Sequence, residues 1–215
     1  MITMATPKEL YYAKRAEILV RNLKSRHFDA YYCATPQQAL ENALELIPKG
    51  STVGWGGVMS AHEIGLIDAL REGDYQVIDR DRFSTPEEKT KAARDCLSAH
   101  TFLTSANALS MDGEMVNIDG AGNRVAAIIF GPDQVLVIAG MNKVVDTLED
   151  AVQRARTVAA PMNQQRFSSN NPCACTGKCS DCKSETSICN HIVITRHCRP
   201  AGRIKFILVG ESLGF

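Results

Sequence analysis

DGEMVNIDGAGNRVAAIIFGPDQVLVIAGMNKVV, residues 112–145, combines three structural signals in one run. The Asp-Gly pair at its start predicts a tight turn, after which residues 115–119 return as the second strand of a hairpin. A short apolar helix is expected over residues 124–130. The β-branched run at 135–140 is typical of a strand buried on both faces of a sheet. The stretch therefore predicts an antiparallel hairpin next to a buried, parallel-type strand.

Outward from this stretch, the chain alternates between helical and strand patterns. Strands are expected at residues 28–34, 51–57, 75–79 and 101–109, and again at 191–196 and 203–210. Threonine followed by proline marks three helix starts, at Thr6, Thr35 and Thr85. The alternation predicts an α/β fold with a largely parallel sheet.

Two further helices are predicted from local signals. Ser60 and Glu63 have the spacing of a capping box, which predicts a helix from Ser60 to about residue 72. An amphipathic helix is expected over residues 146–159, ended by Pro161. Residues 1–215 are interpreted as a single domain, with a cysteine-rich loop at about 170–190.

The composition excludes several classes of function. Lys plus Arg and Asp plus Glu both number 24, so the net charge of zero gives no case for nucleic-acid binding. No apolar run approaches the ~20 residues that a membrane span needs, and the N-terminus carries no apolar signal core. We therefore expect a cytoplasmic protein, in which clustered cysteines more often bind metal than form disulfides.

The segment PCACTGKCSDCKSETSIC, residues 172–189, contains five of the eight cysteines. Thiolates are preferred ligands of iron–sulfur clusters and zinc, and the Cys-x2-Cys pair follows a glycine that permits a tight turn. A metal centre is expected at four of them, with Cys175 as the alternative to Cys173. The expected ligands are Cys173, Cys179, Cys182 and Cys189. The spacing leaves open an iron–sulfur cluster, zinc, or thiols without metal. Cys33 and Cys96, on apolar faces, are expected to be buried.

The glycines at the end of the stretch 51–57, where a short strand runs into them, predict a ligand site. Gly56 and Gly57 let the backbone approach a ligand closely, and Ser60 begins the next helix, so an anion or a carboxylate is a suitable ligand. A tight turn with good capping explains the same residues without a ligand. Glu63 either completes the cap or faces the pocket as a catalytic base.

Two later segments contribute to the same predicted pocket. Asn123 suits a helix N-cap, and Arg124 in the first turn is unfavourable for the helix dipole, which favours a role as an anion clamp held by Asp119. Lys143 follows the buried strand at 135–140, at the carboxyl edge where open α/β sheets bind ligands. A solvated surface lysine is the alternative interpretation of Lys143.

The run at 112–145, together with GWGGVMSAHEIG at 54–65, closely resembles the core of the LUD domain, the lactate-utilisation family. The resemblance extends from the first helix to the final strand. It implies a Rossmann-like, mostly parallel sheet with an antiparallel hairpin insertion, similar to the NagB/RpiA/CoA-transferase fold.

The resemblance also implies a function. Related proteins serve the oxidation of lactate, a 2-hydroxy acid, so a redox or electron-transfer accessory subunit with an iron–sulfur cluster, of the 4Fe-4S type, is expected. Its partners would be a small anionic metabolite and other subunits of a lactate-oxidising complex. The alternative is an enzyme like a sugar-phosphate isomerase or a CoA-transferase, with an anion-binding pocket and a structural zinc.

Overall fold

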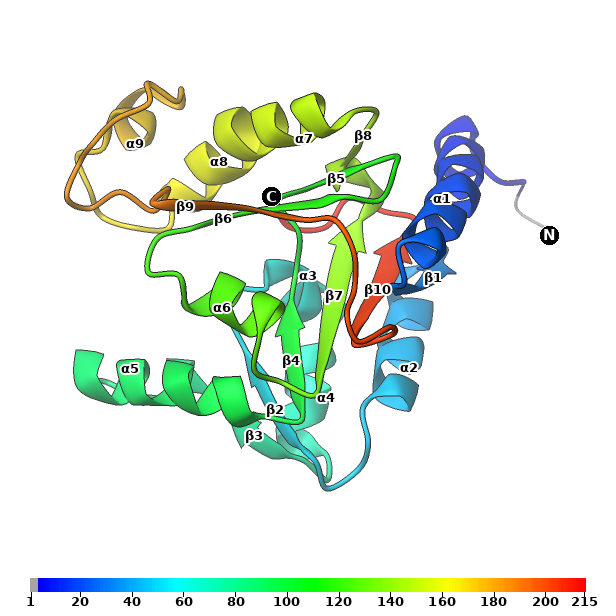
Figure 1. Cartoon of the computed structure of the whole chain (residues 1–215), viewed down its shortest axis with the longest axis horizontal. Coiled ribbons are helices and arrows are strands. Elements are labelled where there is room, and N and C mark those ends of the chain that lie inside the picture. Colours follow the sequence, from blue (N-terminus) through cyan, green and yellow to red (C-terminus); the bar gives the residue numbers. More distant parts are fainter. Residues whose placement is uncertain (1–3) are drawn as a thin grey trace.

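The computed structural model describes residues 4–215 and contains two sheets (Figure 1). All strand pairs of the larger sheet are parallel. Its strands lie in the order β1 (Asp29–Cys33), β10 (Ile204–Val209), β7 (Gln134–Gly140), β4 (Thr101–Thr104), β2 (Thr52–Trp55) and β3 (Gln76–Ile78). The predicted parallel α/β sheet is therefore confirmed.

Helices cover both faces of the larger sheet. One face packs against α1 (Pro7–Ser25) and α6 (Asn123–Ile129), and the other against α2 (Pro36–Leu46), α3 (Met59–Glu63) and α4 (Leu66–Glu72). Every residue of β7 is buried, and alternate residues enter the two cores, as expected for a central strand with a near-continuous apolar sequence. Cys33 and Cys96 are buried as predicted. None of the helices in residues 4–215 is long and apolar enough to cross a membrane.

The smaller sheet lies across the carboxyl ends of the larger sheet's strands (Figure 1). Its order is β8 (Val144–Val145), β5 (Ala108–Ser110), β6 (Met115–Asp119) and β9 (His191–Thr195). The β5–β6 pair is the predicted hairpin, and it is antiparallel. The prediction of a single strand over residues 101–109 is wrong, because the chain leaves the larger sheet after Thr104 and enters the smaller sheet at Ala108. The last two predicted strands, β9 and β10, likewise lie in different sheets.

The helix predicted at 146–159 does not end before Pro161. It comprises α7 (Leu148–Arg154), a π-helical segment (Ala155–Ala159) and α8 (Ala160–Gln164), and it covers the smaller sheet. Proline lacks an N–H and clashes with the carbonyl four residues earlier, here Thr157. The wider π turn surrounds that position and lets the helix continue past the proline.

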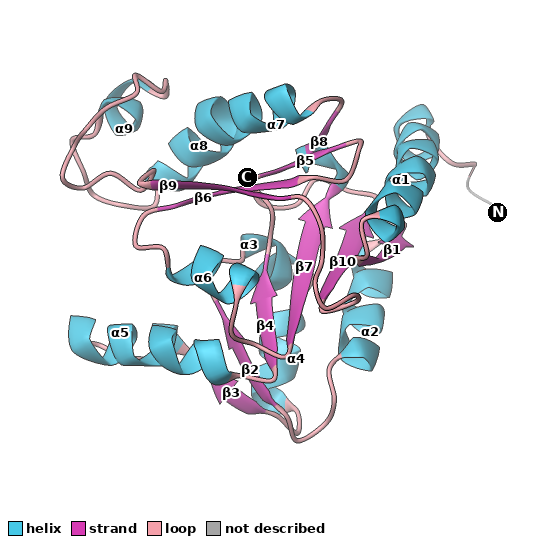
Figure 2. Ribbon diagram, in the orientation of Figure 1, coloured by secondary structure: helices cyan, strands magenta, loops and turns pink. Residues whose placement is uncertain are grey.

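The remaining elements lie at the periphery. The helix α5 (Pro86–Asp95) starts at the predicted capping box of Thr85 and Glu88. It is flanked by two 3-10 turns, at Arg80–Arg82 and Cys96–Ser98, and a third one, Met141–Lys143, follows β7. The cysteine-rich segment is mostly loop, with one short helix, α9 (Pro172–Thr176) (Figure 2).

Candidate functional site

A cavity of about 490 Å³ opens at the carboxyl edge of the larger sheet. Gly57 follows β2, Ser105 follows β4 and Lys143 follows β7, and all three line this cavity. The three strands are neighbours in the sheet, so their carboxyl ends bring these residues together. This is the edge at which open α/β sheets bind ligands.

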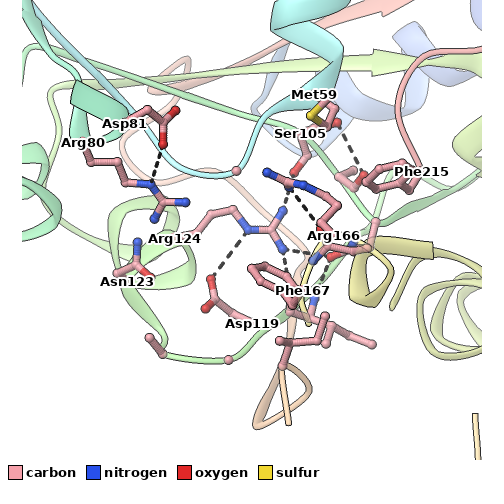
Figure 3. A pocket seen from close by; sticks show the side chains of 18 of the residues that line it. Met59, Arg80, Asp81, Ser105, Asp119, Asn123, Arg124, Arg166, Phe167 and Phe215 are labelled. Carbon is pink, nitrogen blue, oxygen red and sulfur yellow. Dashed lines mark hydrogen bonds and ion pairs between the residues drawn. The ribbon is translucent and has the colours of Figure 1, made fainter. Parts of the chain in front are cut away.

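The cavity is basic. Five basic side chains and two carboxylates, Asp81 and Asp119, line it. The basic residues are Arg80, Lys89, Arg124, Lys143 and Arg166. Arg124 is 3.6 Å from Asp119, between Nε and Oδ2, and Arg80 is 3.9 Å from Asp81 (Figure 3). Within residues 4–215 the other three basic side chains form no ion pair, so the wall favours an anionic ligand.

Lys143 is the most unusual of these groups, because its side chain is buried; the residue is only 3% exposed. Its Nζ donates to Ser105 Oγ at 2.9 Å and to Ser60 Oγ at 3.2 Å. The pKa of Lys143 is lowered to about 7, chiefly by burial and also by the charges of Arg154 and Arg124, against a smaller opposing effect of Glu63. The interpretation of Lys143 as a solvated surface residue is therefore wrong.

Arg124 crosses the floor of the cavity (Figure 3). Its Nη2 donates to Ile118 O at 2.6 Å and to Asn107 Oδ1 at 3.0 Å, and its Nη1 lies 3.4 Å from Ser105 O. These contacts hold the end of β4 against the end of β6. Arg124 therefore organises the cavity wall, and its role as an anion clamp stays a prediction.

Asn123 is not the N-cap of α6. The N-cap is Gly122, which has a φ of 85° and whose N–H donates to Asp119 Oδ1 at 2.8 Å. A left-handed conformation favours glycine at this position. Asn123 is the first helical residue and lines the cavity.

The predicted capping box at Ser60 and Glu63 is wrong. The helix α3 begins at Met59 without a side-chain cap, and it ends before Gly65, whose φ of 78° separates it from α4. Ser60 is instead fully buried and its hydroxyl lies 3.3 Å from that of Ser105. Glu63 accepts a hydrogen bond from the backbone N–H of Gly214 at 2.7 Å.

The two glycines differ in what they contact. A Cβ on Gly56 would lie 3.2 Å from the Arg124 side chain, so the glycine lets Arg124 pack against this turn. A Cβ on Gly57 would meet only Arg166 Nη1, at 3.8 Å. Gly57 lines the cavity and leaves the space open to a ligand.

Ser105 and Arg166 are site residues that the sequence interpretation missed. Ser105 directly follows the buried strand β4 in the structure, but the sequence resembles one strand over residues 101–109, so the rule that pointed to Lys143 did not find it. Arg166 follows α8 in a polar segment with no motif, and it reaches the cavity only because the helix continues past Pro161.

All four cysteines that are expected to bind metal border the same second cavity, which has a volume of about 280 Å³. The pKa of Cys189 is raised to about 11, chiefly by burial and also by the neighbouring Cys173, Cys179 and Cys182. Cys175 does not border this cavity and is exposed. Within residues 4–215 no three His, Cys, Asp or Glu side chains are close enough to hold a metal ion, so the sulfurs surround the cavity without converging. Four thiols around one space match the ligand number of a 4Fe-4S cluster or of zinc.

The parallel sheet with a basic cavity at its carboxyl edge defines a Rossmann-like α/β protein, consistent with the NagB-like fold. Within that class the family is specific. The model of the LUD domain matches residues 16–209, and the chain therefore belongs to the LUD domain family.

A solved structure supports the fold. The chain is similar to a DUF162 family protein from Deinococcus radiodurans, with a TM-score of 0.51 and 12% identity, over 96% of this chain and 99% of that chain. A weaker likeness links it to eIF2B delta from Chaetomium thermophilum, with a TM-score of 0.36 and 15% identity, over 65% of this chain and 57% of that one. No curated protein matches the chain.

Proposed function

We propose that this protein serves lactate utilisation by binding a small 2-hydroxy or 2-oxo carboxylate in the basic cavity. The observation that carries the proposal is the cavity's surplus of cationic side chains, of which Lys89 and Arg166 have no carboxylate partner within residues 4–215. Membership of the LUD domain family supports a lactate-related ligand. A carboxylate of this size can accept charge-assisted hydrogen bonds from a guanidinium while its 2-oxygen faces Lys143 and Ser105.

The test is a titration with lactate and with pyruvate, followed by thermal shift and calorimetry. Lactamide, which lacks the negative charge, is the control ligand. In Arg166→Gln we expect binding about 10- to 100-fold weaker, because a hydrogen bond to a charged group contributes ~1.5–3 kcal/mol. Arg94→Gln changes an exposed arginine of α5 that does not line the cavity, and it should bind like the wild type. Equal affinity for lactate and lactamide would overturn the proposal.

The second part of the proposal concerns the cysteines. Cys173, Cys179, Cys182 and Cys189 would hold an iron–sulfur cluster, which supplies one-electron transfer when bound. Support comes from the four thiols around one cavity and from the exposure of the fifth, Cys175. Protein purified without oxygen should show broad visible absorbance and contain iron and sulfide. Cys179→Ser should lose most of the iron, whereas Cys175→Ser should keep it. A colourless protein with one equivalent of zinc would overturn the cluster.

That zinc result would favour the alternative, an isomerase- or CoA-transferase-like enzyme with a structural zinc. One observation favours such an enzyme. Lys143 lines the cavity and has a pKa of about 7, which suits a group that exchanges protons with a ligand at neutral pH. Stabilisation by inorganic phosphate or acetyl-CoA, without any effect of lactate or pyruvate, would select this alternative.

A further inference from the structure

The hydrogen bonds around Lys143 match those of a neutral amine. A neutral amine has two N–H donors and one lone pair, whereas an ammonium has three donors. Nζ has two acceptors, the hydroxyls of Ser60 and Ser105, and no carboxylate within ion-pairing distance among the described residues. Two acceptors match the two hydrogens of the neutral amine, and the lone pair is then left without a hydrogen-bond partner.

The charges around Lys143 also favour the neutral amine. Arg154 from α7 and Arg124 from α6 oppose its protonation, and Glu63 from α3 only partly offsets them. The carboxylate of Glu63 already accepts from Gly214 N–H. Burial and neighbouring cations are the two means by which proteins turn a lysine into a nucleophile near neutral pH.

Ser105 is the other possible nucleophile of the cluster, and its contacts argue against it. Its Oγ donates to Ile138 O at 2.7 Å, accepts from Lys143 at 2.9 Å and lies 3.3 Å from Ser60 Oγ. Because its hydrogen is committed to a carbonyl, this hydroxyl acts as an acceptor that orients the amine. Lys143 is therefore the attacking group of the cluster.

We propose that Lys143 forms an imine with the carbonyl carbon of a small 2-oxo acid bound in the basic cavity, an inference that rests on the proposed binding of carboxylates there. The Nζ lone pair forms a bond to the carbonyl carbon, and one proton of the attacking amine passes to the carbonyl oxygen. The resulting carbinolamine loses its hydroxyl group and the remaining N–H proton as water, and the C=N bond forms. The net change is amine plus ketone to imine plus water, and no oxidant or reductant is needed.

The basic wall supplies the specificity. Arg166 and Lys89 line the same cavity as Lys143, so a carboxylate bound to them presents its adjacent carbonyl to a wall that contains the amine. A ketone without a carboxylate lacks this anchor. Acetone should therefore react at Lys143 far more slowly than pyruvate, because binding raises the effective concentration of the carbonyl at the amine.

The test traps the imine by reduction. The full chain is incubated with pyruvate and sodium cyanoborohydride, and peptide mapping by mass spectrometry locates the stable secondary amine. We expect the adduct on Lys143 to exceed that on the exposed Lys91 by on the order of tenfold or more. Lactate, which has no ketone, should give none. An adduct spread over surface lysines and absent from Lys143 would overturn the inference, whatever the behaviour of any variant.

Two variants and one binding measurement complete the design. Lys143→Arg places a permanently charged side chain at this position and cannot form the imine, so its adduct should be lost, while Lys91→Met should label at Lys143 like the wild type. Thermal shift with lactate, which has no ketone and cannot form an imine, reports binding alone. Binding without an adduct at Lys143 overturns the imine and leaves the proposed function standing. The absence of both binding and adduct would count against the imine and against the proposed function.

Discussion

Replacing Lys143 by methionine tests the protonation state of the buried amine. In the folded protein this lysine has a pKa of about 7, whereas in the unfolded chain it has the ordinary value of about 10.4. Between these two values the unfolded state holds one more proton than the folded state, so the free energy of unfolding rises with pH. One proton contributes about 1.4 kcal/mol per pH unit, or about 4 kcal/mol between pH 7 and pH 10. The methionine variant lacks this contribution.

The assay is urea unfolding of wild type and Lys143→Met at intervals from pH 6 to pH 10. The cysteines and the surface groups titrate in both proteins, so the difference between the two curves isolates Lys143. We expect the wild type to gain stability relative to the variant above pH 7, and the two curves to run parallel below about pH 6. Lys91→Met, at an exposed site of α5, should run parallel to the wild type throughout. Parallel curves for Lys143→Met over the whole range would show that the amine stays protonated, and would refute the reasoning behind its nucleophilic role.

Three further predictions address the surroundings of the site and the fold. Arg154→Met should raise the midpoint of the Lys143 transition, since the charge of Arg154 lowers that pKa; an unchanged midpoint in the same pH series would contradict this. Gly54→Ala should lower the free energy of unfolding in urea by about 1–3 kcal/mol, because the added Cβ would lie 2.5 Å from Cys96 Sγ. Gly57→Ala, whose added Cβ would have its nearest atom at 3.8 Å, should lower it far less. Equal decreases would mean that the Cys96 side chain moves aside. Thr85→Ala should lower the free energy of unfolding by about 1 kcal/mol, because it removes the capping box of α5. Thr90→Ala, in the exposed middle of that helix, should change it by less than about 0.5 kcal/mol. A larger effect of Thr90→Ala than of Thr85→Ala would exclude the cap as a stabilising element.

Local signals predicted those parts of the fold in which the side chain acts on its own segment. The caps at Thr6, Thr35 and Thr85 are confirmed because each hydroxyl bonds to a backbone N–H three residues away. Ser60 has the same spacing to a glutamate, yet its hydroxyl contacts Ser105 and Lys143, which are 45 and 83 residues away in sequence. A rule based on local sequence cannot predict that the Ser60 hydroxyl accepts a hydrogen bond from the buried Lys143 amine instead of capping its own helix.

The site residues also divide into those that the sequence could predict and those that it could not. Lys143 could be predicted, since it follows a buried strand whose carboxyl end lies at the edge where open α/β sheets bind ligands. Ser105, Asn107 and Arg166 could not. Asn107 enters the site because the chain crosses from the larger to the smaller sheet between Thr104 and Ala108, within a stretch that resembles one strand in the sequence. Arg166 depends on a helix that passes a proline, against the usual effect of that residue.

The cysteine segment and the basic cavity share a wall. Ile118 lines both cavities, and Ile188, the residue before Cys189, lines the basic one. A Cβ on Gly120 would lie 3.1 Å from Ile188 Cα, and Asn190 Nδ2 donates to Gly120 O at 3.1 Å, so the end of the cysteine segment packs against the turn that follows Asp119.

This contact links the four sulfurs to the ligand edge. The turn at 119–122 carries Asp119, which pairs with Arg124, and Arg124 in turn holds the ends of β4 and β6 together. A metal that drew Cys189 toward the other three sulfurs would fix the backbone at 187–190, and with it the wall of the basic cavity. A centre at these cysteines would therefore stiffen the wall of the basic cavity whether or not it carried electrons, because Cys189 borders one cavity and its neighbour Ile188 lines the other.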